Sequence, residues 1–186
     1  MGFTDSIRCE LIHERSQVRL TVVHMPALNT PQFGWVRSRL PHKAQPVPPI
    51  FQPEVAAEAI TWAADHSRRE VWVGASTYEA ILGQKVAPDL LDRFLGKSGY
   101  QSQQYDGPED PNRPDNLWDT VRGNQSAHGS FDDRAHPKSS MLWVTEHRGW
   151  FVLAGILAGS VIASRLRAII PASLVSVSHN SRGEDA

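Results

Sequence analysis

Apolar positions recur at helical spacing from the first residues of the chain. A period of three to four residues, with charged residues on the opposite side, predicts a helix that begins near Gly2 and is defined by Phe3, Ile7, Leu11 and Ile12. Residues 53–66 repeat this pattern after a proline, which suits the first turn of a helix. Two further helices are expected at residues 78–86 and 89–95.

Two short runs rich in β-branched residues predict strands that are buried in a sheet. They cover residues 17–24 and 69–74. The order helix, strand, helix, strand, helix is typical of an α/β fold with a parallel sheet. Because sheets usually contain about four to six strands, we expect further strands from another chain or from a part of the domain outside this sequence.

Prolines and polar residues divide the remainder of the chain. Residues 41–53 hold five prolines and are expected to be extended or turned. Gln, Gly, Pro, Asn, Asp and Ser dominate residues 98–140, which predicts a disordered linker in which Leu117 and Trp118 alone could dock. The predicted organisation is an α/β portion at 1–97, this linker at 98–140, an apolar helix at 141–172 and a disordered tail at 173–186.

Composition narrows the classes of function. The 186 residues carry a net charge of −1, so we expect no nucleic-acid partner. Cys9 is the one cysteine, which excludes a disulfide scaffold, and its neighbours favour a small buried apolar role. The eight histidines lack metal-ligand spacing, so no metal site is expected, and His13, His42 and His66 are predicted at the surface. The start of the chain lacks the pattern of a signal peptide, which favours a cytoplasmic location.

The loop at residues 26–31 is the candidate site, because ligands of open α/β sheets bind outside the carboxyl ends of the strands. Asn29 supplies an amide there and Thr30 a hydroxyl. Both side chains could instead satisfy backbone groups of the loop.

Several segments of the sequence, taken in order, resemble the C-terminal half of short-chain dehydrogenases/reductases. They are Gly2-Phe-Thr-Asp-Ser-Ile-Arg-Cys-Glu-Leu, Val18-Arg-Leu-Thr-Val-Val, Pro26-Ala-Leu-Asn-Thr-Pro, Pro53-Glu-Val-Ala-Ala and Glu70-Val-Trp-Val-Gly. The resemblance covers about residues 2–95. It implies the C-terminal part of a Rossmann-type parallel sheet, and hydride transfer between NAD or NADP and an alcohol or carbonyl substrate.

The resemblance also implies roles for individual residues. Pro26, Ala27, Asn29 and Thr30 match the loop that closes over the cofactor, although Ala27 replaces a common glycine and the spacing is contracted. Two aromatic residues fall where the family has its variable substrate lid, Phe33 and Trp35.

The family's Gly-rich turn, catalytic serine and Tyr-x-x-x-Lys have no counterpart in this sequence. Tyr78 and Lys85 lie too far apart and too late in the chain to replace that pair. We therefore expect this chain to be a fragment of an oxidoreductase. As given, it should be inactive and bind NAD or NADP poorly, and Met1 should be an internal residue of the longer protein.

Residues 150–163 form an uncharged apolar run, about 21 Å long as a helix. Gly155 and Gly159 give it a small-xxx-small pattern, and its flanks carry Trp143, Trp150, Arg165 and Arg167. Contact with a membrane and packing against protein both remain open. The alternative to a dehydrogenase fragment is therefore a non-enzymatic, membrane-tethered interaction protein, and a second copy of the chain is a candidate partner.

Overall fold

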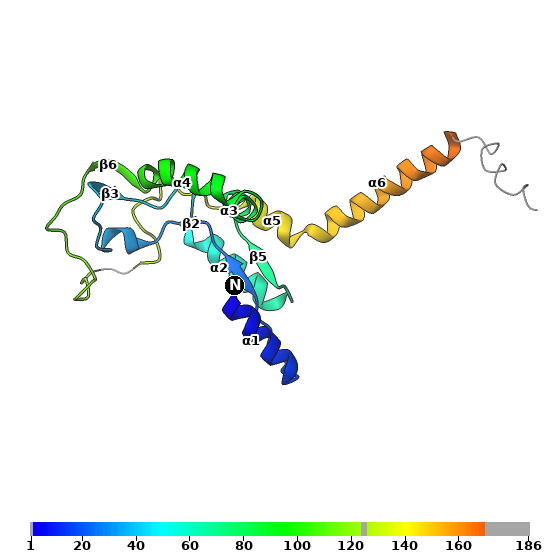
Figure 1. Cartoon of the computed structure of the whole chain (residues 1–186), viewed down its shortest axis with the longest axis horizontal. Coiled ribbons are helices and arrows are strands. Elements are labelled where there is room, and N and C mark those ends of the chain that lie inside the picture. The colour runs from blue at the N-terminus through cyan, green and yellow to red at the C-terminus, as the bar shows by residue number, and fades with distance from the viewer. Residues whose placement is uncertain (1, 124–125, 170–186) are drawn as a thin grey trace, which may run out of the picture. The chain divides into compact units, whose positions relative to one another are not determined.

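A computed structural model describes residues 2–123 and 126–169, with the side chains of the last helix described to Arg165. The chain divides into two units, Met1–Glu146 and His147–Ala186, which we describe separately. The predicted tail at 173–186 lies outside the described residues. Figure 1 shows the elements of both units.

The first unit alternates short strands with helices. Its elements are α1 (Gly2–His13), β1 (Val22–His24), β2 (Ala27–Leu28), the 3-10 turn η1 (Pro31–Gly34), β3 (His42–Ala44), β4 (Ile50–Phe51), α2 (Pro53–Asp65), β5 (Glu70–Trp72), α3 (Ala75–Val86), α4 (Pro88–Ser102), β6 (Gln104–Pro108) and α5 (Ser140–Glu146). The second unit contains α6 (Arg148–Ile169).

The two predicted strands pair in parallel, as the α/β pattern requires. β1 lies beside β5, with Val23 opposite Val71. Two further pairs were not predicted from the sequence: β2 is parallel to β4, and β3 is antiparallel to β6. Their two to five residues are too few to show a periodic pattern. Strand β1 is also shorter than the predicted strand at residues 17–24, because only the last three of those residues pair with β5.

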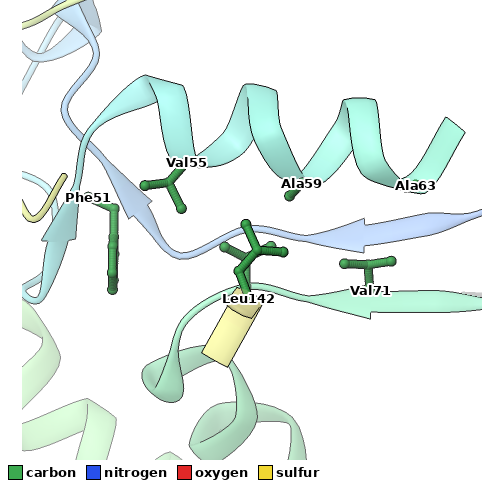
Figure 2. Close-up of a cluster of buried hydrophobic side chains, with 7 residues drawn as sticks. Phe51, Val55, Ala59, Ala63, Val71 and Leu142 are labelled. Carbon is green, nitrogen blue, oxygen red and sulfur yellow. The ribbon is translucent and has the colours of Figure 1, made fainter. Parts of the chain in front are cut away.

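Helix α2 covers the parallel pair with one face. Val55, Ala59 and Ala63 are spaced four residues apart, so they lie on the same side of the helix, and all three are buried (Figure 2). The other buried members of this cluster are Phe51 of β4, Val71 of β5, Val73 just after it and Leu142 of α5. The core therefore includes a residue from beyond the polar segment, and α5 packs with the α/β elements.

The structure differs from the expected linker at residues 98–140. Helix α4 continues to Ser102, strand β6 follows, and Phe131 is 2% exposed. Gln45 is buried and donates from Nε2 to the carbonyls of Ser102 and Gln104, at 3.1 and 2.8 Å. Low apolar content favours disorder, but hydrogen bonds of polar side chains also hold this segment in place.

Three single-residue predictions are wrong. Leu117 and Trp118 are 54% and 82% exposed, and the aromatic residue that docks is Phe131. Cys9 is exposed, since helix α1 has no buried residue. Apolar neighbours in the sequence predict burial of Cys9, but the half-buried residues of this helix include Ile7 and Leu11, and Cys9 is not among them. His13, His42 and His66 are exposed as predicted.

The predicted apolar helix is broken near His147 into α5 and α6. Among residues 2–123 and 126–169, no single helix is long and apolar enough to cross a membrane. Helices α5 and α6 meet that test only together, as a bent pair, on length and composition.

Candidate functional site

The loop after β1 borders two cavities of about 580 and 530 Å³. Pro26, Ala27 and Val47 line both of them. These volumes fall in the range of small-molecule sites. Gly74, at the end of β5, supports the loop: it has φ +86°, and a Cβ there would lie 3.1 Å from Cβ of Pro26. The carboxyl ends of both parallel strands therefore contribute to the same site.

Asn29 is fully buried, and its amide cross-links three parts of the chain. Nδ2 donates to Oε1 of Gln52 at 3.0 Å and to Oδ1 of Asp132 at 2.8 Å, while Oδ1 accepts the Phe131 N–H at 3.1 Å. Its backbone N–H donates to the Phe51 carbonyl at 2.8 Å. The polar groups of this side chain are thus engaged within the protein.

Thr30 has the opposite character. Its backbone N–H donates to the Leu28 carbonyl at 3.0 Å. Its side-chain hydroxyl has no hydrogen-bond partner among the described residues, and the residue lines the 530 Å³ cavity. The adjacent positions Asn29 and Thr30 therefore differ: the amide holds the loop in place, and the hydroxyl is available to a ligand.

The two aromatic residues expected in a lid are also separated by the structure. Phe33 lines the 530 Å³ cavity and meets the ring of Phe131 edge-on, with centroids 5.9 Å apart. Trp35 is not among the lining residues of either cavity, and its carbonyl accepts the backbone N–H of Asn116 at 3.0 Å.

Arg113 holds this segment from the far side. Its Nη1 donates to the Phe33 carbonyl at 2.8 Å and its Nη2 to the Val36 carbonyl at 2.7 Å. Nε lies 2.7 Å from Oε1 of Glu109, which orients the guanidinium. The polar segment after β6 thus fixes the backbone around η1.

A second polar cluster was not predicted from the sequence. His128 contacts Asp132 through Nδ1 at 2.9 Å and Glu54, at the start of α2, through Nε2 at 2.7 Å. The hydrogen bond to Asp132, followed by that to Glu54, raises the pKa of His128 above 6.5. Hydrogen bonds from His128 lower the pKa of both Glu54 and Asp132. Spacing along the chain gives no sign of Glu54, which lies 74 residues from His128.

This cluster ties residues 128–136 to the loop rather than forming a metal site. The two ring nitrogens of His128 face different carboxylates, so the three groups do not converge. Among the described residues no group of three His, Cys, Asp or Glu side chains could hold a metal ion. His136 continues the attachment, since its N–H donates to the Ile50 carbonyl at 2.8 Å and its carbonyl accepts the Gln52 N–H at 3.0 Å.

His24, at the carboxyl end of β1, borders the 580 Å³ cavity. Its buried Nε2 lies 3.3 Å from Oε2 of Glu70 without hydrogen-bond geometry. That carboxylate accepts the indole N–H of Trp72 at 2.8 Å. Tyr78 and Lys85 both lie against the Trp72 ring, so their contacts in the structure are packing contacts.

Comparison with known proteins gives one informative match. Over 161 residues the chain is 30% identical to a protein of Bacillus subtilis (strain 168) described as "Uncharacterized oxidoreductase YxnA". The match covers 86% of this chain and 44% of that protein, so the chain spans less than half of the relative's length. No family model and no solved structure matches the sequence. The similarity is therefore to an oxidoreductase.

Proposed function

We propose that this chain is the C-terminal part of an NAD(P)-dependent short-chain dehydrogenase/reductase. The observation that carries the proposal is the position of Thr30, whose hydroxyl has no hydrogen-bond partner among the described residues and which lines a cavity just beyond the end of the parallel strand β2. Ligands of open α/β sheets bind at this edge. The similarity to a Bacillus subtilis oxidoreductase and the family-like order of the segments support the same proposal.

The residues around the loop fit a nicotinamide cofactor. Pro26 and Ala27 present backbone and small side chains to both cavities, and Thr30 offers a hydroxyl that can donate to a carboxamide or phosphate oxygen. Asn29 acts as a positioning residue, because its buried amide fixes the backbone that carries Thr30. When bound, the cofactor would supply or accept the hydride.

The substrate side of the site is apolar. Ten of the fourteen residues that line the 580 Å³ cavity are apolar, including Met25, Val47, Ile81 and Phe94. An alcohol or carbonyl compound with an apolar body suits this lining, since burial of its surface is favourable at about 25 cal/mol per Å². Phe33 extends the apolar surface into the neighbouring cavity.

Hydride transfer to a carbonyl also needs a proton donor beside the developing alkoxide. The described residues around Thr30 supply no tyrosine with a lysine at the family's spacing. We infer that the proton donor and the phosphate-binding turn belong to a preceding part of a longer protein. The chain as given then binds NAD or NADP poorly and does not transfer hydride.

Two measurements test this proposal: the DNA sequence in frame ahead of Met1, and an assay of NAD(P)H oxidation. We expect an in-frame Tyr-x-x-x-Lys close upstream, and NAD(P)H oxidation by the extended protein with an apolar ketone. The purified 186-residue chain should show neither cofactor oxidation nor reduction. A stop codon directly upstream, or cofactor turnover by the 186-residue chain alone, would contradict the proposal.

A further inference from the structure

The segment of α6 between its flanking arginines is apolar on every side. Residues 149–164 carry no charged side chain. Trp150, Val152, Leu153, Ile156 and Val161 are between 48% and 69% exposed. Successive helix positions are about 100° apart, so positions 150–153 alone point in four directions. A helix with this distribution has no polar face to present to water, and is typical of helices surrounded by apolar material.

The polar groups of this segment are satisfied within the helix. Ser160 Oγ donates to the Leu157 carbonyl at 2.8 Å, and Ser164 Oγ donates to the Val161 carbonyl at 2.7 Å. The backbone groups are paired by the helix itself. Removal from water therefore leaves neither hydroxyl without an acceptor, which is the condition for burial in hydrocarbon.

The ends of the segment carry positive charge. Arg148 precedes it and Arg165 follows it, with Trp150 two residues after Arg148. Arginine and tryptophan side chains are among those that contact lipid head groups, arginine through its affinity for phosphate and tryptophan through its amphipathic ring. The sixteen residues are about 24 Å long as a helix, less than the ~30 Å of a hydrocarbon core.

From these observations we propose that residues 149–164 of α6 insert into the hydrocarbon of one leaflet of a lipid bilayer without crossing it, with the flanking arginines extending to the phosphate head groups of that leaflet. Lipid covers a helix from all directions, as this segment requires, whereas one protein face or one copy of the same helix covers a single stripe. This contact is independent of the cofactor site, because it uses no residue of the loop at 26–31. The helix length accords with the finding that no single described helix is long and apolar enough to cross a membrane.

Flotation of the full chain with vesicles tests the proposal. Vesicles of phosphatidylcholine with a fraction of phosphatidylglycerol should carry the wild-type chain to the top of a density gradient. The variant V152E/I156E should stay at the bottom, since two carboxylates in hydrocarbon are strongly unfavourable. The matched control is V86E/L90E, which places two carboxylates four residues apart on other exposed apolar positions, 82% and 69% exposed, and should float like the wild type.

A fluorescent label reports the depth directly. In a Cys9→Ser background, an environment-sensitive label on Ile156→Cys should shift to shorter wavelength when vesicles are added, and the same label on Leu90→Cys should not. The proposal is overturned if the wild-type chain does not float, or if both double variants float equally. It is also overturned if α6 instead mediates lipid-independent self-association that V152E/I156E abolishes.

Discussion

Asn29 and Asp132 lie 103 residues apart in the chain, yet Nδ2 of Asn29 donates a 2.8 Å hydrogen bond to Oδ1 of Asp132. The same carboxylate oxygen accepts from Nε2 of Gln52 at 3.0 Å. This contact joins the loop after β1 to the polar segment that precedes α5. The position of Thr30 at its cavity therefore depends on residues far along the sequence.

Replacement of Asn29 by alanine should destabilise the first unit by about 2–3 kcal/mol. The substitution removes three hydrogen bonds and leaves the buried Phe131 N–H without its acceptor, which costs about 1–3 kcal/mol. Urea unfolding of the full chain measures the change. The control N116A alters an exposed asparagine whose contact is made by its backbone, and should leave the midpoint unchanged. Equal midpoints for the two variants would show that the Asn29 amide is not a structural cross-link.

Gly129 packs directly against the loop, so Gly129→Ala should also destabilise the protein. A Cβ there would lie 2.5 Å from the Thr30 carbonyl oxygen and 2.8 Å from Oδ1 of Asn29, closer than van der Waals contact allows. We expect a loss of about 1–3 kcal/mol, as in other overpacked sites. Gly34→Ala is the matched change in open space and should be neutral or slightly stabilising. Thermal melts of both variants give the comparison, and a neutral Gly129→Ala would refute the close approach.

Arg113→Lys should release the segment around η1 without unfolding the protein. Lysine keeps the charge but cannot donate to the Phe33 and Val36 carbonyls in the fixed geometry of a guanidinium. Hydrogen exchange followed by mass spectrometry should show faster exchange at residues 31–37 and little change in α2. Arg93→Lys on the exposed face of α4 is the control. Unchanged exchange at 31–37 would mean that Arg113 does not hold this segment.

The attachment of residues 128–136 should depend on pH in a defined direction. The pKa of His128 is raised, so its stabilising contribution is complete below its ordinary value of 6.5 and is lost as the pH rises through the higher folded value. The pKa values of Glu54 and Asp132 are lowered from 4.5 and 3.8, so their contributions are present above those values and are lost as the pH falls through the folded ones. The attachment is therefore strongest between about pH 4.5 and 6.5.

His128→Gln provides the measurement. Backbone amides at 128–136 should exchange more slowly in the wild type than in the variant at about pH 5.5, after correction for intrinsic rates, and this difference should shrink at about pH 8.5. His13→Gln, on the exposed surface of α1, should match the wild type at both values. A difference that grows toward high pH would contradict the sign of these shifts.

The helices and the parallel pair could be predicted because their signals are local. Pro53 and the stripe of Val55, Ala59 and Ala63 define α2 from sequence alone, and β-branched residues mark β1 and β5. The pairs β2–β4 and β3–β6 could not be predicted, because strands this short are defined by their partners.

The candidate site could be predicted only in part from the sequence. The position of the loop at 26–31 could be predicted from the strand before it. The different environments of Asn29 and Thr30 could not be predicted from the sequence. Those environments depend on Asp132, Phe131 and Gly129, which lie in a segment whose polar composition predicted disorder. Hydrogen bonds between distant residues leave no periodic trace in a single sequence.

We have proposed that Thr30 contacts a nicotinamide cofactor in an oxidoreductase of which this chain is the C-terminal part. Steady-state kinetics of the extended protein with an apolar ketone test it most directly, with Thr30→Val compared against the matched Thr61→Val, whose hydroxyl donates to the Ala57 carbonyl on α2. We expect the KM for NAD(P)H to be raised about tenfold or more by Thr30→Val, as for loss of a hydrogen bond to a charged group, and to be unchanged by Thr61→Val. An extended protein without NAD(P)H-dependent activity, or equal KM values in the two variants, would contradict it.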